Sequence, residues 1–417
     1  MSTMSKGKRN FILVLINMTA AVVFFTPYLR FSYYDQMIAA LNLSNQDFGN
    51  LAGVYGIVAM VGYLPSGLLA DRFSPKLLLS ISCFGMGVCT LWHALFPSYT
   101  ALLIIYALFG IFSVVTFWSP YLKCVRSLGN EDEQGRLFGT SEALRGCTAT
   151  IVAFGCLGLL GMFADGVQGF QTLLFANAAL FILFGILSIL FLPKIEKGEK
   201  ETVFDLNLIV KAVKNPGLWL VTLLIFCGYG LATFGANYLG TYGTQILGVS
   251  EQLSSTFSII RTYVLVIVGG VLGGILADKF KSRSLFIGLL FCICGVTIGL
   301  ILMTAHTFVG ICIVMTFILS FCYYTIKSLY FSTLGEAGIP FVMTGISTGI
   351  ISFIGLSPDV FITPMVGSWL DAGVESGFNK MFISMVVFGI VGIIAAYAIY
   401  RRGKKLKEAG LLEDSES

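Results

Sequence analysis

The chain has 417 residues, of which 56% are hydrophobic and 12% charged, and its mean hydropathy is +0.88. A soluble globular protein does not need so much apolar surface, so the composition excludes that class and indicates a helical membrane protein with many spans. The formal net charge is only +4 and the basic residues lie in short loops, which argues against a nucleic-acid partner.

Twelve apolar runs follow one another along the chain, each near the length of about 20 residues that crosses a bilayer as a helix. The first six are 11–34, 47–69, 76–94, 99–122, 136–162 and 170–192, and the second six are 217–240, 252–275, 284–304, 307–333, 341–368 and 379–400. The first run is expected to be a retained helix, because no small-residue cleavage site interrupts it. The predicted parts are an N-terminal six-helix bundle at 1–192, a linker at 193–215, a C-terminal bundle at 216–400 and a tail at 401–417.

Basic residues alternate between successive loops. Lys and Arg gather before the first span, after the second, fourth, sixth and eighth, and after the last, whereas the alternate loops carry neither: 35–46, 95–98, 163–169, 241–251 and 369–378. Because positive charge marks cytoplasmic loops, this pattern predicts that both termini are cytoplasmic. The tail begins basic and ends acidic, and we expect it to be disordered.

The linker combines two kinds of sequence. Apolar residues recur with helical spacing opposite Lys211 and Lys214, which predicts an amphipathic helix on the inner membrane face; they are Phe204, Leu206, Ile209, Val210 and Val213. Residues 194–202 fit a flexible tether equally well.

Cysteine and histidine give no sign of a metal site. The 10 Cys lie inside or at the ends of predicted spans, which favours buried free thiols, and Cys292-Ile-Cys294 is expected inside a helix. Histidine occurs only at His93 and His306, both expected in short loops. We therefore expect no metal, no cofactor and no catalytic residues.

One sequence pattern occurs twice, half a chain apart. Gly67-Leu-Leu-Ala-Asp71-Arg72-Phe-Ser-Pro-Lys76 follows the second span, and Gly274-Ile-Leu-Ala-Asp278-Lys279-Phe-Lys281-Ser-Arg283 follows the eighth. Asp71 and Asp278 are 207 residues apart. We expect each glycine to allow a close helix approach, and each acid to pair with the basic residues or a helix end at the cytoplasmic rim.

This doubled pattern resembles the signature loops of the major facilitator superfamily, between its second and third and its eighth and ninth helices. The resemblance implies an all-α integral membrane protein with twelve transmembrane helices in two pseudo-symmetric six-helix bundles. It also implies a secondary transporter that works by alternating access, in the bacterial inner membrane, without need of a partner subunit.

Charges that cannot reach water are the candidate site residues, because a charge facing lipid costs several kcal/mol. Arg261 lies 13 residues before Gly274, or about 20 Å from the inner rim along a helix. We favour a contact with an anionic substrate; a structural pair with an acid of another helix competes. Lys327 in the tenth span would contact the anion or line the cytoplasmic path.

Arg30 follows Pro27-Tyr28 in the first span. It resembles the arginine of the organophosphate and organic-anion branches of the superfamily, where a first-helix arginine holds an anionic group. The alternative is that Arg30 extends to the outer interface. Asp35 is expected to line the outer mouth. The match to known branches is incomplete: the seventh span has no arginine, and the repeat aligns Arg261 with Tyr55, where nitrate porters have a second arginine.

Three acids are candidates for proton coupling: Glu142, Asp359 and Asp35. Glu142 and Arg145 are three residues apart, which places them on one helix face as a pair. Glu142 either carries a proton when Arg145 engages substrate or forms a permanent ion pair. Asp359, without a basic residue nearby in sequence, is the other proton carrier or the partner of Arg261.

The deep charges comprise four cations (Arg30, Arg145, Arg261, Lys327) and two acids (Glu142, Asp359), which favours an anionic ligand. Neighbouring tyrosines that can contact a hydroxylated anion are Tyr28, Tyr263 and Tyr324. The expected substrate is a sugar acid, sugar phosphate, sulfonate or carboxylate, moved by proton symport or anion exchange. An exporter of amphipathic compounds and a non-transporting membrane sensor are the alternatives.

Overall fold

The computed structural model describes residues 5–129, 133–193, 206–280, 282–304, 307–340 and 343–410. The chain divides into two compact units. Unit 1 comprises Met1–Lys200 and Ser250–Ile267, and unit 2 comprises Glu201–Val249 and Val268–Ser417. The division passes through the eighth predicted span, so the first half of that span packs with the N-terminal helices.

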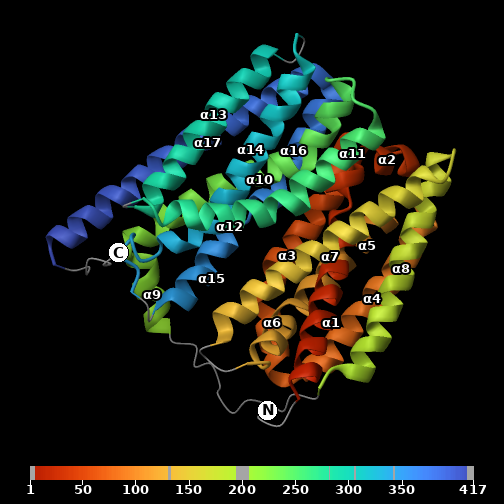
Figure 1. Cartoon of the computed structure of the whole chain (residues 1–417), viewed down its shortest axis with the longest axis horizontal. Coiled ribbons are helices and arrows are strands. Elements are labelled where there is room, and N and C mark those ends of the chain that lie inside the picture. The colour runs from red at the N-terminus through yellow and green to blue at the C-terminus, as the bar shows by residue number, and fades with distance from the viewer. Residues whose placement is uncertain are drawn as a thin grey trace. The chain divides into compact units, whose positions relative to one another are not determined.

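Unit 1 is a bundle of long helices (Figure 1). Its elements are α1 (Lys6–Phe25), η1 (Thr26–Tyr28), α2 (Arg30–Leu41), α3 (Asn45–Arg72), α4 (Pro75–Ala94), α5 (Tyr99–Gly110), η2 (Ile111–Val115), α6 (Trp118–Arg126), α7 (Gln134–Gly161), α8 (Gly166–Phe191), α11 (Glu251–Ile259) and η4 (Ile260–Val264). Helix α4 packs along α8, α1 along α7 and α3 along α5, while α11 contacts α2 and α7.

Unit 2 is a second helical bundle. Its elements are α9 (Leu206–Lys214), α10 (Pro216–Gln245), α12 (Leu265–Ala277, most of which lies in this unit), α13 (Arg283–Thr304), α14 (Val309–Leu329), η5 (Tyr330–Thr333), α15 (Thr344–Gly355), α16 (Pro358–Ala372) and α17 (Val374–Glu408). Helix α17 packs along α10 and α13, and α13 along α14.

Local sequence explains where several helices begin. The Ser44 and Ser74 hydroxyls accept hydrogen bonds from the backbone amides of Asp47 (3.0 Å) and Leu77 (3.4 Å) at the starts of α3 and α4. At the start of α10, the Asn215 side-chain oxygen Oδ1 accepts a hydrogen bond from the Gly217 amide at 2.9 Å. Pro216 occupies the first turn of this helix. These side chains satisfy amides that the helix itself leaves without a partner.

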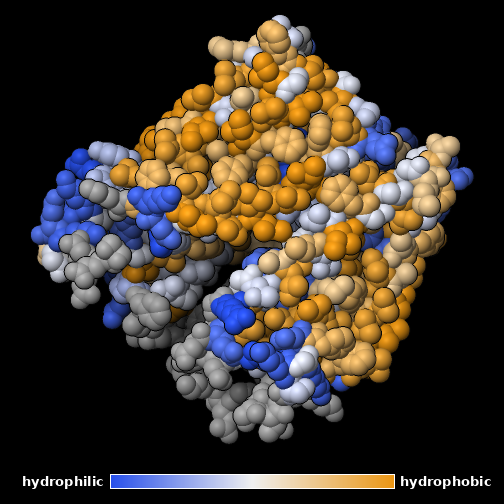
Figure 2. Space-filling view, in the orientation of Figure 1, coloured by the Kyte–Doolittle hydropathy of each residue, from blue (hydrophilic) through white to orange (hydrophobic). Residues whose placement is uncertain are grey.

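The prediction of an all-α membrane fold is confirmed. Eleven helical segments of the described chain are long and apolar enough to cross a bilayer, and they correspond to every predicted span except the second. The second span is helix α3, which has 28 residues. Figure 2 shows apolar residues covering the sides of the helices, with hydrophilic residues gathered near the start of α1 and the end of α17.

Three details of the sequence analysis need correction. The last helix continues to Glu408, so the tail is helical over 401–408, where Arg402 donates to the Ala337 carbonyl (2.8 Å) and to Asn215 Oδ1 (3.1 Å). His93 lies in the last turn of α4 and is fully buried, not in a loop. Cys147 and Cys292 are exposed, whereas the other eight cysteines are buried free thiols.

Parts of the predicted linker and tail lie outside the described residues, as does His306. Within the linker, Leu206–Lys214 forms a helix as predicted. Trp219 anchors its end by donating its indole N–H to the Val213 carbonyl at 2.8 Å.

Candidate functional site

Arg30 lies where the first span changes its helical form. Pro27, which lacks a backbone N–H, occupies the short 3-10 turn between α1 and α2. The Arg30 guanidinium donates to the Pro27 carbonyl at 2.7 Å, and its Cζ lies 4.8 Å from the Tyr28 ring centroid and 5.1 Å from that of Phe31. Arg30 is only 2% exposed, so it does not extend to the outer interface as the alternative interpretation required.

Arg261 lies in a single π-helical turn, η4, between α11 and α12. Such turns insert one residue into a helix and re-aim its side chains, often at functional sites. Arg261 is 5% exposed and donates from Nη2 to the Ser258 hydroxyl at 2.9 Å. Unit 1 therefore contains two buried guanidinium groups, Arg30 and Arg261, from opposite halves of the sequence.

Two of the candidate tyrosines accompany these arginines in unit 1. Tyr28 meets the ring of Tyr55 edge-on, with centroids 5.3 Å apart, and the Tyr55 and Ser113 hydroxyls are 3.1 Å apart. Ser113 belongs to η2, the second π-helical turn. The ring centroid of Tyr263, in η4, lies 6.0 Å from that of Phe25. Neither π-helical turn is predictable from the amino-acid sequence, since the residues of both turns are ordinary for a membrane helix.

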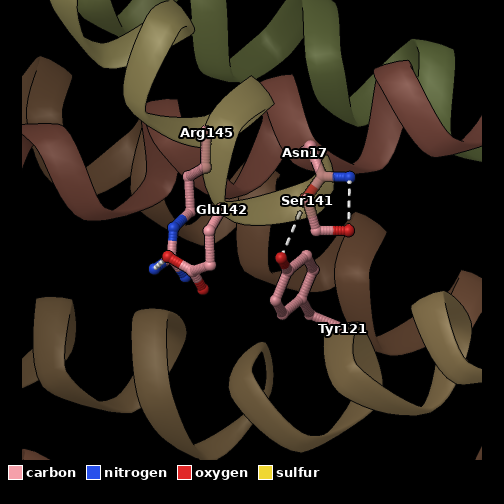
Figure 3. A network of polar contacts seen from close by, with 5 residues as sticks. All are labelled: Asn17, Tyr121, Ser141, Glu142 and Arg145. Atoms are coloured by element: carbon pink, nitrogen blue, oxygen red, sulfur yellow. Dashed lines mark hydrogen bonds and ion pairs between the residues drawn. The ribbon is translucent and has the colours of Figure 1, made fainter. Parts of the chain in front are cut away.

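Glu142 and Arg145 form the predicted pair on α7. Their carboxylate and guanidinium are 2.5 Å apart (Figure 3). The Arg145 Cζ lies 5.8 Å from the Trp118 ring centroid. The Glu142 side chain is 64% exposed, so it is not enclosed within the helices. The prediction that the two share one helix face is confirmed; their role in transport stays a prediction.

A polar network beside this pair was missed by the sequence analysis. Tyr121 of α6 donates to Asn17 Oδ1 of α1 at 2.8 Å, and Asn17 Nδ2 donates to the Ser141 hydroxyl of α7 at 3.1 Å (Figure 3). All three side chains are buried, and Ser141 precedes Glu142 directly. The network thus joins three helices next to the ion pair. An asparagine inside the first apolar run was the one signal that pointed to it.

Replacing Asn17 by leucine will destabilise the protein by about 1–3 kcal/mol, because the Tyr121 and Ser141 hydroxyls then lose a buried partner. Thermal unfolding of the purified protein measures this change. The triple replacement Asn17→Leu, Tyr121→Phe, Ser141→Ala is expected to recover part of the loss. A single variant as stable as the wild type would show that the network contributes nothing.

Asp359 is held within unit 2 by two hydroxyl groups. Tyr229 donates to its Oδ2 at 2.5 Å and Thr233 to its Oδ1 at 3.1 Å, both from α10. The Lys327 ammonium lies 5.1 Å from the Tyr229 ring centroid. Asp359 is in the first turn of α16, which begins after the eleventh span is interrupted at 356–357. Tyr229 therefore contacts both Asp359 and Lys327, which lie on different helices, an arrangement that sequence spacing alone does not reveal.

Two candidates remain, Tyr324 in unit 2 and Asp35 in unit 1. Tyr324 is buried on α14 and packs on the Tyr323 ring at 4.6 Å. Asp35 is partly exposed on α2. Its neighbour Gln36 donates to the Ser255 hydroxyl of α11 at 3.2 Å.

The signature segments show a predicted ion pair but not the predicted close helix approach. Arg283 and Asp278 form an ion pair at 3.5 Å, as predicted for the second copy. Among the described residues, no atom of another helix lies within 4 Å of a Cβ added at Gly67 or Gly274, so the structure does not show the predicted close helix approach at either glycine. Arg72 and Lys279 are exposed, Lys76 is partly exposed in the first turn of α4, and the Asp71 side chain lies outside the described residues.

Comparison with known proteins defines the class. The sequence model of the Major Facilitator Superfamily matches residues 10–358, so the chain belongs to this superfamily. Inner membrane protein YqcE of Escherichia coli (strain K12) is 28% identical, with 97% of each chain covered. Inner membrane protein YihN of the same strain is 27% identical over 96% of this chain and 97% of its own.

Solved structures agree on the fold. A bacterial homologue of the human lysosomal transporter Spinster, in an inward-facing and unoccupied conformation, superposes with a TM-score of 0.80 at 12% identity, covering 96% of this chain and 99% of its own. The nucleoside transporter NupG gives a TM-score of 0.72 at 13% identity, covering 94% and 99%. At these identities the likeness establishes the fold alone. The chain is a multi-pass membrane transport protein of the superfamily.

Proposed function

We propose that the protein carries a small organic anion across the bacterial inner membrane by alternating access, with both termini in the cytoplasm and as a monomer. The inner membrane location follows from the names of the two Escherichia coli relatives. Cytoplasmic termini follow from the distribution of Lys and Arg among the loops.

The burial of two guanidinium groups in unit 1 carries the proposal of an anionic substrate. Arg30 and Arg261 are 2% and 5% exposed. Planar guanidinium groups bind carboxylate, phosphate and sulfonate through paired hydrogen bonds, and a buried guanidinium does so with little competition from water. The aromatic rings next to Arg30 limit its movement and so prepare it for a ligand.

The chemistry of the flanking side chains suggests a hydroxylated anion. Tyr28 lies beside Arg30, the Tyr55 ring packs edge-on against the Tyr28 ring, and the Tyr55 and Ser113 hydroxyls contact each other. Phenol and serine hydroxyls both donate and accept hydrogen bonds, as sugar hydroxyls require. A sugar acid or sugar phosphate fits this set better than a purely apolar compound.

Proteoliposomes loaded with one candidate anion and given the radiolabelled form outside test the proposal. Saturable exchange of sugar acids, sugar phosphates or sulfonates supports it. Transport restricted to cationic or apolar compounds would contradict it and favour an exporter of amphipathic compounds.

Asp359 is the proposed proton carrier, because the Tyr229 and Thr233 hydroxyls donate to it and Tyr229 also contacts Lys327. Replacing Asp359 by asparagine is expected to lower the accumulation driven by a proton gradient by about 100-fold. Exchange between equal pools of substrate on the two sides is expected to persist. Uptake into proteoliposomes with and without an imposed pH gradient measures both.

Glu142→Gln is the matched carboxylate-to-amide control, since Glu142 already pairs with Arg145. If Glu142→Gln loses accumulation and Asp359→Asn keeps it, the coupling role belongs to Glu142. If an imposed pH gradient drives no accumulation in the wild type, the protein is an anion exchanger; unchanged accumulation in both variants would exclude both acids as the proton carrier.

A further inference from the structure

His93 and Tyr106 form a buried polar pair that the proposed transport function does not use. His93 lies in the last turn of α4 and Tyr106 in the middle of α5, both in unit 1. Both side chains are essentially inaccessible to solvent. Within the described structure neither imidazole nitrogen of His93 nor the Tyr106 hydroxyl has a hydrogen-bond partner.

These three polar atoms share an aromatic enclosure. The imidazole lies edge-on to the rings of Tyr106, Phe109 and Phe170, with centroids 6.0, 6.2 and 6.4 Å away. Compact edge-on pairs in unit 2 are closer, such as Tyr242 with Phe382 at 5.0 Å. The rings around His93 therefore stand toward the wide end of the range for such pairs, which is about 4.5–7 Å.

A neutral imidazole always presents one N–H donor and one acceptor nitrogen, and a phenol can donate and accept. Buried polar atoms are nearly always satisfied by protein or by ordered water, because leaving them unpaired is costly. The nearby Gln171 amide does not serve them, since it donates to the Ala94 carbonyl at 2.8 Å. The aromatic walls offer neither a strong donor nor a strong acceptor.

We propose that α4, α5 and α8 enclose an internal water site in which water is hydrogen-bonded to both His93 and Tyr106. One water molecule bonded to an imidazole nitrogen and to the phenol satisfies two of the three atoms, and a second satisfies the remaining nitrogen. The site does not depend on what the protein transports.

A double-mutant cycle tests whether the two side chains share one site. Each of His93→Phe and Tyr106→Phe is expected to lower the unfolding temperature by about 1–3 °C, because the water and the remaining side chain lose a partner. The double variant is expected to be no less stable than the less stable single variant. Tyr106→Phe with Tyr238→Phe is the control pair, since Tyr238 donates to the Thr363 carbonyl in unit 2 and the effects of separate sites add.

If both single variants raise the unfolding temperature, the polar atoms are unsatisfied and the water site is ruled out. Additive losses would place the two groups in separate environments and overturn the shared site.

A spectroscopic measurement separates water from a direct bond between the two side chains. The chain has only two histidines, so His306→Asn leaves His93 as its sole imidazole for ¹⁵N labelling. Water-edited solid-state NMR in lipid is expected to show transfer between water protons and the His93 ring nitrogens. Transfer from the Tyr106 hydroxyl alone, without a water signal, would contradict the proposal.

Discussion

Replacing Arg30 by glutamine will lower the rate of anion transport at limiting substrate by about 100-fold or more, because it removes a buried charge from its ligand. Arg30→Lys is expected to recover only a small part, since an ammonium keeps the charge but not the paired donors of the guanidinium. Uptake by proteoliposomes measures both variants.

The control for Arg30 is Arg401→Gln at the exposed part of α17, where Arg401 donates to the Tyr397 hydroxyl at 3.3 Å. This variant is expected to transport like the wild type. The unfolding temperature of Arg30→Gln is expected not to fall, because burying a guanidinium carries a desolvation cost. A clear loss of stability together with normal transport would assign Arg30 a structural role instead.

Linking Gln36 to Ser255 will stop transport. These residues are in hydrogen-bond contact at 3.2 Å, and they join α2 of the N-terminal half of the chain to α11 of the C-terminal half. Alternating access, as we propose it, requires the two halves to separate at one end in each cycle. The double variant Gln36→Cys, Ser255→Cys, treated with a short reducible thiol cross-linker, is expected to lose more than about nine-tenths of its uptake and to regain it on reduction.

The matched control joins two positions within the N-terminal half. Asn50 donates to the Tyr99 hydroxyl at 3.2 Å, linking α3 and α5. Cysteines at 50 and 99 are expected to cross-link without loss of uptake. Both pairs are best placed in a background with the exposed Cys147 and Cys292 changed to serine. Full activity of the cross-linked 36–255 pair would show that this contact persists throughout transport.

Hydropathy and charge predicted the fold well, because crossing a bilayer imposes length and loop charge directly on the sequence. The spans, the helical linker segment and the pairing of Glu142 with Arg145 all depend on local spacing. The extension of α17 to Glu408 does not depend on local spacing. Arg402 in this extension bonds to Asn215 and to the Ala337 carbonyl, which are distant in sequence.

The site was predictable only in part for the same reason. Arg30 and Arg261 stand out as charges in apolar runs, but the π-helical turn that carries Arg261 has no sequence signature. Asp359 lacks a basic residue nearby in sequence, and only the fold brings Tyr229 and Thr233 to it and Lys327 to the Tyr229 ring. At the glycines of the signature segments, the sequence predicted a contact that the described structure lacks. Small residues often mark close helix packing, but the space beside Gly67 and Gly274 is open.

Ligand-induced thermal stabilisation of the purified protein tests the central claim most directly. The screen covers sugar acids, sugar phosphates, sulfonates, dicarboxylates and nitrate, with Arg261→Gln measured alongside. We predict that one class of organic anion raises the unfolding temperature of the wild type, and that the rise is lost in the variant. Stabilisation by apolar or cationic compounds instead, unchanged in Arg261→Gln, would contradict an anion site at the buried arginines.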